Sequence, residues 1–190
     1  TLEAMAAEMA AAPKDQDSHF NSPKYVGLYA LLAAVKAESD PGAALDWAKS
    51  VPEDVRNQCL RTILPLLAKS DPEAARKALD DMKSKQVGAQ VFIGSGREQV
   101  MDQIVGEIGK TDPAAALQWA VKAGGEGHDH ISPIANLMRS ALAEGRLTPQ
   151  EAFALIQEQK SEGDGIRINV LRKMWNGLPA GAFASAAEWL

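Results

Sequence analysis

The sequence predicts an all-α protein, an α-α superhelix (solenoid) of about five antiparallel helix pairs. Three observations support this fold class: a short phrase recurs along the chain, apolar residues keep helical spacing before each copy, and strand signals are nearly absent. Apolar residues make up 46% of the chain and aromatic residues only 5%, because much of the apolar fraction is alanine. Alanine is the best helix former, and its small side chain favours closely packed helices.

The recurring phrase is DPGAALDWA at residues 40–48, which returns as DPAAALQWA at 112–120 with seven of nine positions identical. Further copies are DPEAARKAL at 71–79 and the weaker TPQEAFALI at 148–156. The starts at 40, 71, 112 and 148 are separated by 31, 41 and 36 residues. Such spacing is typical of helix-pair repeats.

Each copy has the residue order that opens a helix. Asp or Thr at the N-cap accepts hydrogen bonds from free backbone N–H groups, and the proline that follows has no N–H to leave unpaired. At Thr148, a capping box with Glu151 is expected. Each copy therefore predicts a short second helix, called helix B. Its bulky packing residues are Leu45 and Trp47 in one copy and Leu117 and Trp119 in another.

An amphipathic helix, called helix A, is predicted before each helix B. A capping box of Ser95 and Glu98 is expected to open the third helix A, and Pro65 should kink or end the second one early. The apolar residues at helical spacing are Tyr25, Leu28, Leu32 and Val35 in the first helix A; Val55, Cys59, Leu60, Ile63 and Leu67 in the second; Val100, Met101, Ile104, Val105 and Ile108 in the third; and Ile134, Leu137, Met138, Ala141 and Leu142 in the fourth.

The chain is therefore divided into an N-terminal helix and linker (1–23) and a helical-repeat domain (24–190). The longest interruption, 84–96, leaves open whether the array divides into two halves. The expected repeats are roughly 24–50, 51–83, 97–123, 131–160 and 164–190.

Two interpretations of the last repeat stay open. Either a helix A spans 164–175 and a helix B opens near Pro179, or Trp175 closes one helix and SAAEWL at 185–190 is a degraded copy of the phrase. Because solenoid ends usually have a polar outer face, the final Trp189–Leu190 pair leads us to expect that the natural chain continues.

The paired helices resemble the tetratricopeptide-like and HEAT-like α-solenoid superfamily. The tetratricopeptide pattern W-x2-L-G-x2-Y is missing, and the DP dipeptide opens helix B rather than closing it. The phrase is more similar to the alanine-rich DP-x-A-A-x-x-W-A helical repeats of large bacterial proteins. This resemblance covers nearly the whole chain. It implies a solenoid fold and assigns no activity and no functional residue.

Charge and composition narrow the classes of partner. The net charge of −5 argues against nucleic-acid binding, which usually needs a basic surface. No apolar run approaches the roughly 20 residues that span a bilayer, so no membrane insertion is expected. The single cysteine, Cys59, excludes an intrachain disulfide and leaves the redox compartment open.

Few residues are candidates for chemistry. His128 and His130 flank Asp129 and are weak candidate metal ligands, but a loop in which Asp129 or His130 caps the next helix near Ile131 is favoured. Cys59 falls on an apolar helix face, where a small buried side chain is the usual finding. No cofactor and no catalytic residue are predicted.

Arg56 and Arg97 are the candidate partner-binding residues. Each lies 15 residues before the Asp of its repeat, so stacked repeats would align them on one surface that receives acidic side chains or a peptide carboxylate. The alternative is a local salt bridge or a solvated arginine. Arg97 also lies in GSGRE at 94–98, where glycines before a helix could bind an anion, although the G-K-[ST] of a phosphate loop is missing.

These observations predict a non-catalytic helical-repeat scaffold that mediates protein–protein or peptide interaction. The alternative is a structural spacer or accessory domain of a larger envelope or secreted enzyme. A third hypothesis is a metal-dependent hydrolase that uses the His128–His130 loop.

Overall fold

The structure is a computed structural model that describes residue 4 and residues 23–82, 96–124, 130–158 and 165–175. All regular secondary structure in these residues is helical, which confirms the all-α prediction. The chain forms two compact units, Thr1–Met82 and Lys83–Leu190. Within the described residues, none of the helices combines the length and apolar character needed to cross a membrane.

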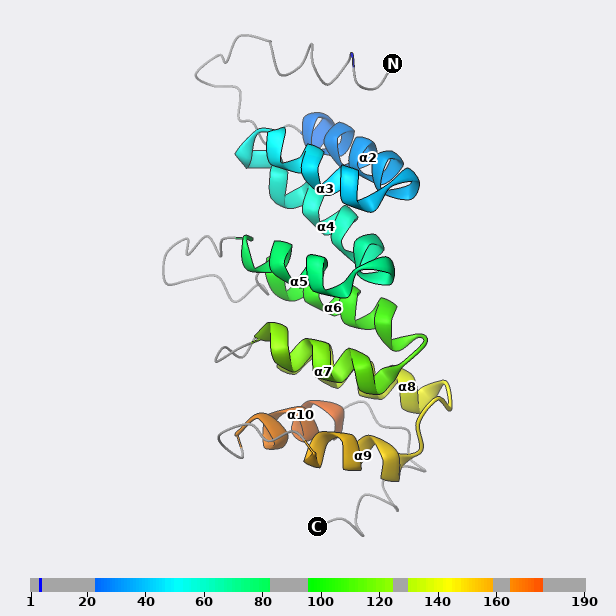
Figure 1. Cartoon of the computed structure of the whole chain (residues 1–190). Coiled ribbons are helices and arrows are strands. Elements are labelled where there is room, and N and C mark those ends of the chain that lie inside the picture. Colours follow the sequence, from blue (N-terminus) through cyan, green and yellow to red (C-terminus); the bar gives the residue numbers. More distant parts are fainter. Residues whose placement is uncertain (1–3, 5–22, 83–95, 125–129, 159–164, 176–190) are drawn as a thin grey trace, which may run out of the picture. The chain divides into compact units, whose positions relative to one another are not determined.

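The first unit is built around α4, which packs against α2, α3 and α5 (Figure 1). Its core is rich in aliphatic side chains from α4, with Ile63 and Leu64 among the largest that are fully buried. The ring of Trp47 stacks on Tyr29 with centroids 6.3 Å apart, and Nζ of Lys36 lies 5.6 Å from the Trp47 ring centroid. The four helices are α2 (Pro23–Ser39), α3 (Pro41–Ser50), α4 (Glu53–Ser70) and α5 (Pro72–Asp80).

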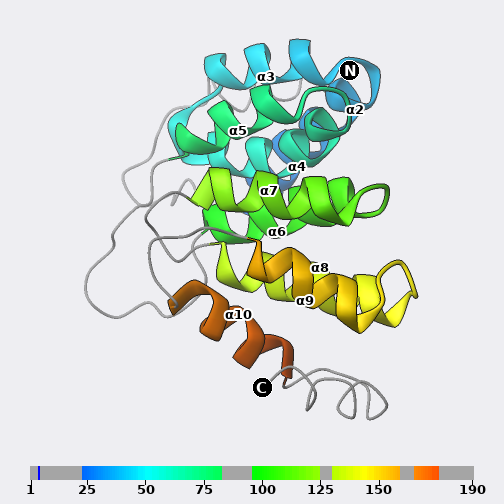
Figure 2. The same cartoon turned by 60° about the horizontal axis from the view of Figure 1, so that its bottom comes forward.

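The second unit is built around α8, which packs against α6, α7, α9 and α10. Three helices of the helix A kind, α6, α8 and α10, follow one another as packed neighbours (Figure 2). Trp119 of α7 is buried in this unit, as expected for a packing residue. The described helices are α6 (Gly96–Gly109), α7 (Pro113–Gly124), α8 (Ile131–Ala143), α9 (Pro149–Gln157) and α10 (Gly165–Trp175).

The predicted starts of helix B are confirmed at all four copies of the phrase. A proline is the first residue of α3, α5, α7 and α9, and the residue before it accepts a hydrogen bond from the backbone. The capping box at Thr148 is present in full. The three Asp caps accept from Ala43, Ala74 and Ala115, each at 2.9 Å.

The predicted apolar faces of the second, third and fourth helices A are largely confirmed. All five residues proposed for α4 are buried. On α6 and α8 the proposed residues are buried except Ile108 and Leu142, which are partly exposed. The cores of both units are therefore formed by the faces that the periodicity indicates.

Two expectations need correction. Of the two outcomes expected at Pro65, a kink or an early end, the early end is wrong, because α4 continues through Pro65 to Ser70. The buried face of this helix offsets the hydrogen bond that a proline removes, a loss of about 3 kcal/mol in a helix interior. On α2, Val35 is 51% exposed rather than buried, and the covered positions include Ala33 and Ala37. Of the other residues proposed for this face, Leu32 is buried and Leu28 is partly exposed, so the pattern of large residues placed the face only in part.

Several predictions fall outside the described residues. These are the N-terminal helix and linker, apart from residues 4 and 23, the cap at Ser95, and both interpretations of the chain after Trp175. The helix pairs α2–α3, α4–α5, α6–α7 and α8–α9 fall in the first four expected repeats.

Candidate functional site

Arg56 and Arg97 both direct a guanidinium group at the C-terminal end of a helix. Nη2 of Arg56 donates to the backbone oxygens of Lys49, at 3.2 Å, and Val51, at 3.1 Å, where α3 ends. Nη2 of Arg97 donates to the backbone oxygen of Ala123, at 2.7 Å, where α7 ends. A cation is favourable there because the last carbonyls of a helix lack intrahelical donors and carry partial negative charge.

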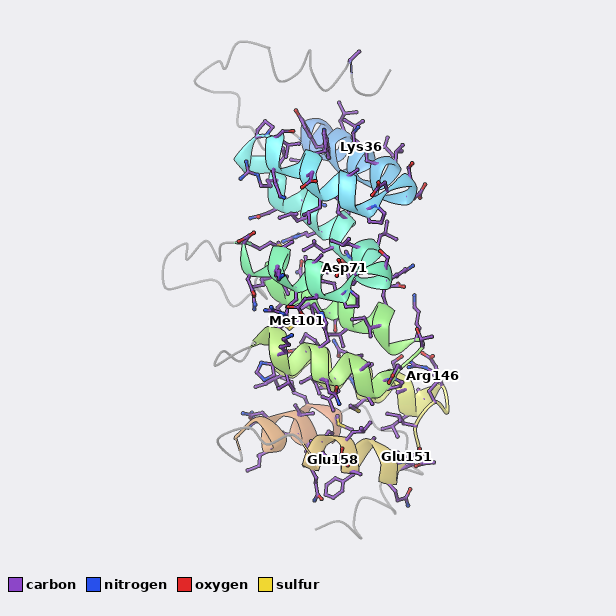
Figure 3. The ribbon with its side chains drawn as sticks, in the orientation of Figure 1. Lys36, Asp71, Met101, Arg146, Glu151 and Glu158 are labelled. Atoms are coloured by element: carbon purple, nitrogen blue, oxygen red, sulfur yellow. The ribbon has the colours of Figure 1, made fainter. Side chains whose placement is uncertain are left out.

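The two arginines differ in the helix that they reach. Arg56 of α4 contacts the helix before it, and Arg97 of α6 contacts the helix after it. Arg146, labelled in Figure 3, repeats the arrangement by donating to the backbone oxygen of Gly109, the last residue of α6. These contacts give the arginines a role in joining helices, and the partner-binding role of Arg56 and Arg97 stays a prediction.

The predicted metal loop is described only at His130. This residue is fully buried, and its ring lies against Gly124, the last residue of α7. It occupies the N-cap position of α8 but makes no side-chain cap bond. In the part of the chain that the structure describes, no group of three or more His, Cys, Asp or Glu side chains could hold a metal ion.

Cys59 lies in the core of the first unit, as its place on an apolar face predicts. Its Sγ is 3.7 Å from the backbone oxygen of Tyr29. Burial raises the pKa of the thiol to about 12, and a hydrogen bond with the backbone of Cys59 itself lowers it only in part. The thiol is therefore protonated at neutral pH, whereas a nucleophilic cysteine needs its thiolate form.

A polar chain joins α6 to α8 on their partly exposed surface. Nδ2 of Asn136 donates to Oδ1 of Asp102 at 2.8 Å, and Nη2 of Arg139 donates to Oδ1 of Asn136. Both ends of the Asn136 amide are thus engaged. Asp102 of the neighbouring helix α6 fixes the amide nitrogen of Asn136. The amide oxygen of Asn136 then holds Arg139, which lies one turn further along α8.

A second polar contact joins α8 to α10. Nζ of Lys173 donates to Oγ of Ser132. On α10 itself, Nη2 of Arg172 donates to Oδ1 of Asn169 at 2.7 Å. The Asp102–Asn136 and Ser132–Lys173 bonds thus link α6, α8 and α10, and the Asn169–Arg172 pair lies within α10. We call these side chains the polar row: Asp102, Ser132, Asn136, Arg139, Asn169, Arg172 and Lys173.

The polar row contains a repeated pair that the sequence reasoning missed. Asn136 and Arg139 of α8 stand in the order N-x-x-R, and Asn169 and Arg172 of α10 repeat it 33 positions later. In each pair the arginine donates to the asparagine oxygen. The recurrence of N-x-x-R at a repeat-length interval was the available signal. This signal lies in the helices A, outside the recurring phrase that opens helix B.

Comparison with known proteins adds no assignment: no family model, curated protein or solved structure matches this chain.

Proposed function

We propose that this chain is a non-catalytic helical-repeat scaffold that mediates protein–protein or peptide interaction, built as an α-solenoid of about five helix pairs. Four capped copies of one phrase and the packing of α6, α8 and α10 as successive neighbours support the solenoid part. The resemblance to alanine-rich DP-x-A-A-x-x-W-A repeats belongs to the same proposal. Stacked helix pairs offer extended surfaces that contact a partner through several repeats.

The observation that supports the interaction role best is the polar row. It links side chains of three successive helices A of the second unit, through one bond between α6 and α8 and one between α8 and α10. An extended segment lying across these helices would meet hydrogen-bonding groups from each repeat in turn. Such a surface recognises a peptide without a catalytic pocket. Cys59 does not favour a catalytic role instead, because its thiol is buried and protonated.

A selection from an unbiased peptide-display library tests the proposal. Enriched peptides should bind the purified chain, and binding should weaken when Asn136→Ala removes the amide that holds Arg139. Gln118→Ala is the matched control, because Gln118 is an exposed amide on α7, away from the polar row. If no peptide is enriched, the interaction role fails and the structural-spacer alternative takes its place.

A further inference from the structure

One exposed side of α2 is apolar. Leu31 and Val35 lie one turn apart and are 49% and 51% exposed, and Gly27 is exposed one turn before them. A Cβ atom built on Gly27 would meet nothing within 4 Å, so the space over this turn is open. The exposed side of a surface helix normally carries polar residues. We call Gly27, Leu31 and Val35 the outer stripe.

The opposite side of α2 forms the contacts with the rest of the first unit. The ring of Tyr29 stacks on Trp47 of α3, and the backbone oxygen of Tyr29 lies 3.7 Å from Sγ of Cys59 in α4. At 3.6 residues per turn, Tyr29 and Leu31 lie on opposite sides of the helix. Apolar residues on both sides are typical of a helix that is covered on both.

The helices of the second unit show such double cover. Of the helix A kind, α8 packs against two others, α6 and α10, whereas the one that packs extensively against α2 is α4. In the described part of the chain, the other large apolar side chain with comparable exposure is Ile168 of α10. The outer stripe therefore lies where a further helix would cover α2.

The segment that precedes α2 has the sequence of such a helix. Residues 2–11 read LEAMAAEMAA, and Leu2, Met5 and Met9 stand at i, i+3 and i+7. This spacing places the three large apolar side chains on one helix face, and both glutamates of the segment fall outside it. Ala4, which the structure describes as helical and exposed, falls on the opposite face.

The lengths of the segment and of its tether also fit. Ten helical residues are about 15 Å long, and the outer stripe covers about 12 Å of α2. The tether, residues 12–22, has 11 residues and can span about 36 Å. It can therefore bring the segment back along α2. Alanines of the segment and Gly27 of the stripe are small, so the two helices can approach closely.

From this complementarity we infer that residues 2–11 form a helix that docks on the outer stripe of α2. Leu2, Met5 and Met9 then cover Leu31 and Val35. The inference is independent of the proposed interaction role, which concerns the second unit. The tether favours this occupant over a second copy of the chain, because it holds the segment near the stripe at a high effective concentration.

Hydrogen–deuterium exchange of the full chain, read by mass spectrometry, tests the docking. An isolated helix of ten residues is marginal in water, so slow exchange within 5–11 requires packing. We expect these amides to exchange about tenfold or more slowly relative to a synthetic peptide of residues 1–12. Val35→Asp should remove this protection, because docking would bury its carboxylate. Equal exchange in the wild-type chain and the peptide would overturn the inference.

Ile168→Asp is the matched control, since it makes a similar change at an exposed aliphatic residue of α10. It should leave exchange within 5–11 unchanged, and an effect as large as that of Val35→Asp would show general destabilisation instead. Changes in the segment itself supply the reciprocal test. Met5→Asp should speed exchange, whereas Ala4→Asp on the opposite face should not. Equal effects of these two variants would contradict the predicted docking face.

Light scattering and a concentration series separate the tethered segment from a second copy. We expect protection within 5–11 to be independent of protein concentration, because the contact is intramolecular. Protection that increases with concentration would assign the contact to a second copy and overturn the inference. So would a dimer that Val35→Asp converts to a monomer without changing exchange within 5–11, since the stripe would then be the dimer interface.

Discussion

The imidazole ring of His130 lies directly against Gly124: a Cβ atom built on Gly124 would be 2.0 Å from Nδ1 and 2.4 Å from Cγ of the ring. Gly124 ends α7, and His130 immediately precedes α8. The absent side chain of the glycine is therefore what lets the buried ring sit between the end of one helix and the start of the next.

Gly124→Ala is expected to destabilise the chain by about 1–3 kcal/mol, because the added methyl group overlaps the ring and must displace it. Gly106→Ala is the matched control, since this glycine lies within α6 and a Cβ there meets nothing within 4 Å. There we expect a gain of up to about 1 kcal/mol from helix propensity. Urea unfolding of both variants measures the difference. A neutral Gly124→Ala would show that the His130 ring moves aside at little cost.

Glu151 is expected to make the stability of the chain depend on pH. Its carboxylate accepts from the backbone N–H of Thr148 at 2.7 Å and from its hydroxyl at 2.8 Å. These bonds lower the pKa of Glu151 below its ordinary value of 4.5. A group whose pKa is lowered by folding stabilises the fold above its unfolded pKa, and this contribution is lost as pH falls through the folded pKa.

Glu151→Gln keeps an acceptor oxygen for the cap and removes the titration. We expect wild type to be the more stable protein at neutral pH and the difference to vanish at acidic pH, as shown by thermal melts over a pH series. Glu158→Gln is the control at the other end of α9 (Figure 3). A carboxylate is unfavourable beside C-terminal carbonyls, so this change should have the opposite sign. A pH-independent difference for Glu151→Gln would contradict the prediction.

The Cys59 thiol is expected to be almost unreactive in the folded chain. Its pKa is raised from 9.0 to about 12, so its thiolate fraction at a given pH falls by about a thousandfold. A thiol reagent at mildly alkaline pH should label native protein slowly and urea-unfolded protein fast, with mass spectrometry following the adduct. Rapid labelling of protein that still shows full helical circular dichroism would contradict the buried position.

Arg97→Met is expected to lower the free energy of unfolding by about 1 kcal/mol, because the Ala123 oxygen loses its charged donor. Lys77→Met on the exposed face of α5 should change it by less than about 0.5 kcal/mol. The Arg97→Met variant also tests the prediction that Arg97 binds a partner. If a peptide selected on wild type binds Arg97→Met unchanged, the arginine serves the fold alone. An unchanged unfolding free energy would instead argue against the helix-joining role.

Local contacts explain why the helix starts could be predicted so closely. The caps at Asp40, Asp71 and Asp112 each join residues three positions apart, and the proline that follows each cap shapes the same short segment. Nothing distant along the chain is needed for these bonds. The heptad-like apolar spacing of α4, α6 and α8 is equally local, and it placed most of the core correctly.

The candidate site could not be predicted in the same way, because its bonds join distant parts of the chain. The donor and acceptor are 34 positions apart for Asn136 and Asp102, and 41 apart for Lys173 and Ser132. Arg97 was placed by its register in the repeat, yet its acceptor, Ala123, is 26 positions away on another helix. The position of a residue within the repeat indicates which helix face it occupies, but it does not indicate which group of another helix the side chain contacts.

The sequence by itself therefore determined the helical class, the starts of the second helix in four repeats, and most of the apolar faces. These follow from capping, proline geometry and helical periodicity, which act within a few residues. Only the tertiary structure decided that Arg56 and Arg97 contact helix ends, that His130 is buried against Gly124, and that Asp102 with Asn136 and Ser132 with Lys173 join neighbouring helices. Those outcomes depend on how closely neighbouring helices pack, and that packing is decided by alanine and glycine positions whose patterns carry little signal of their own.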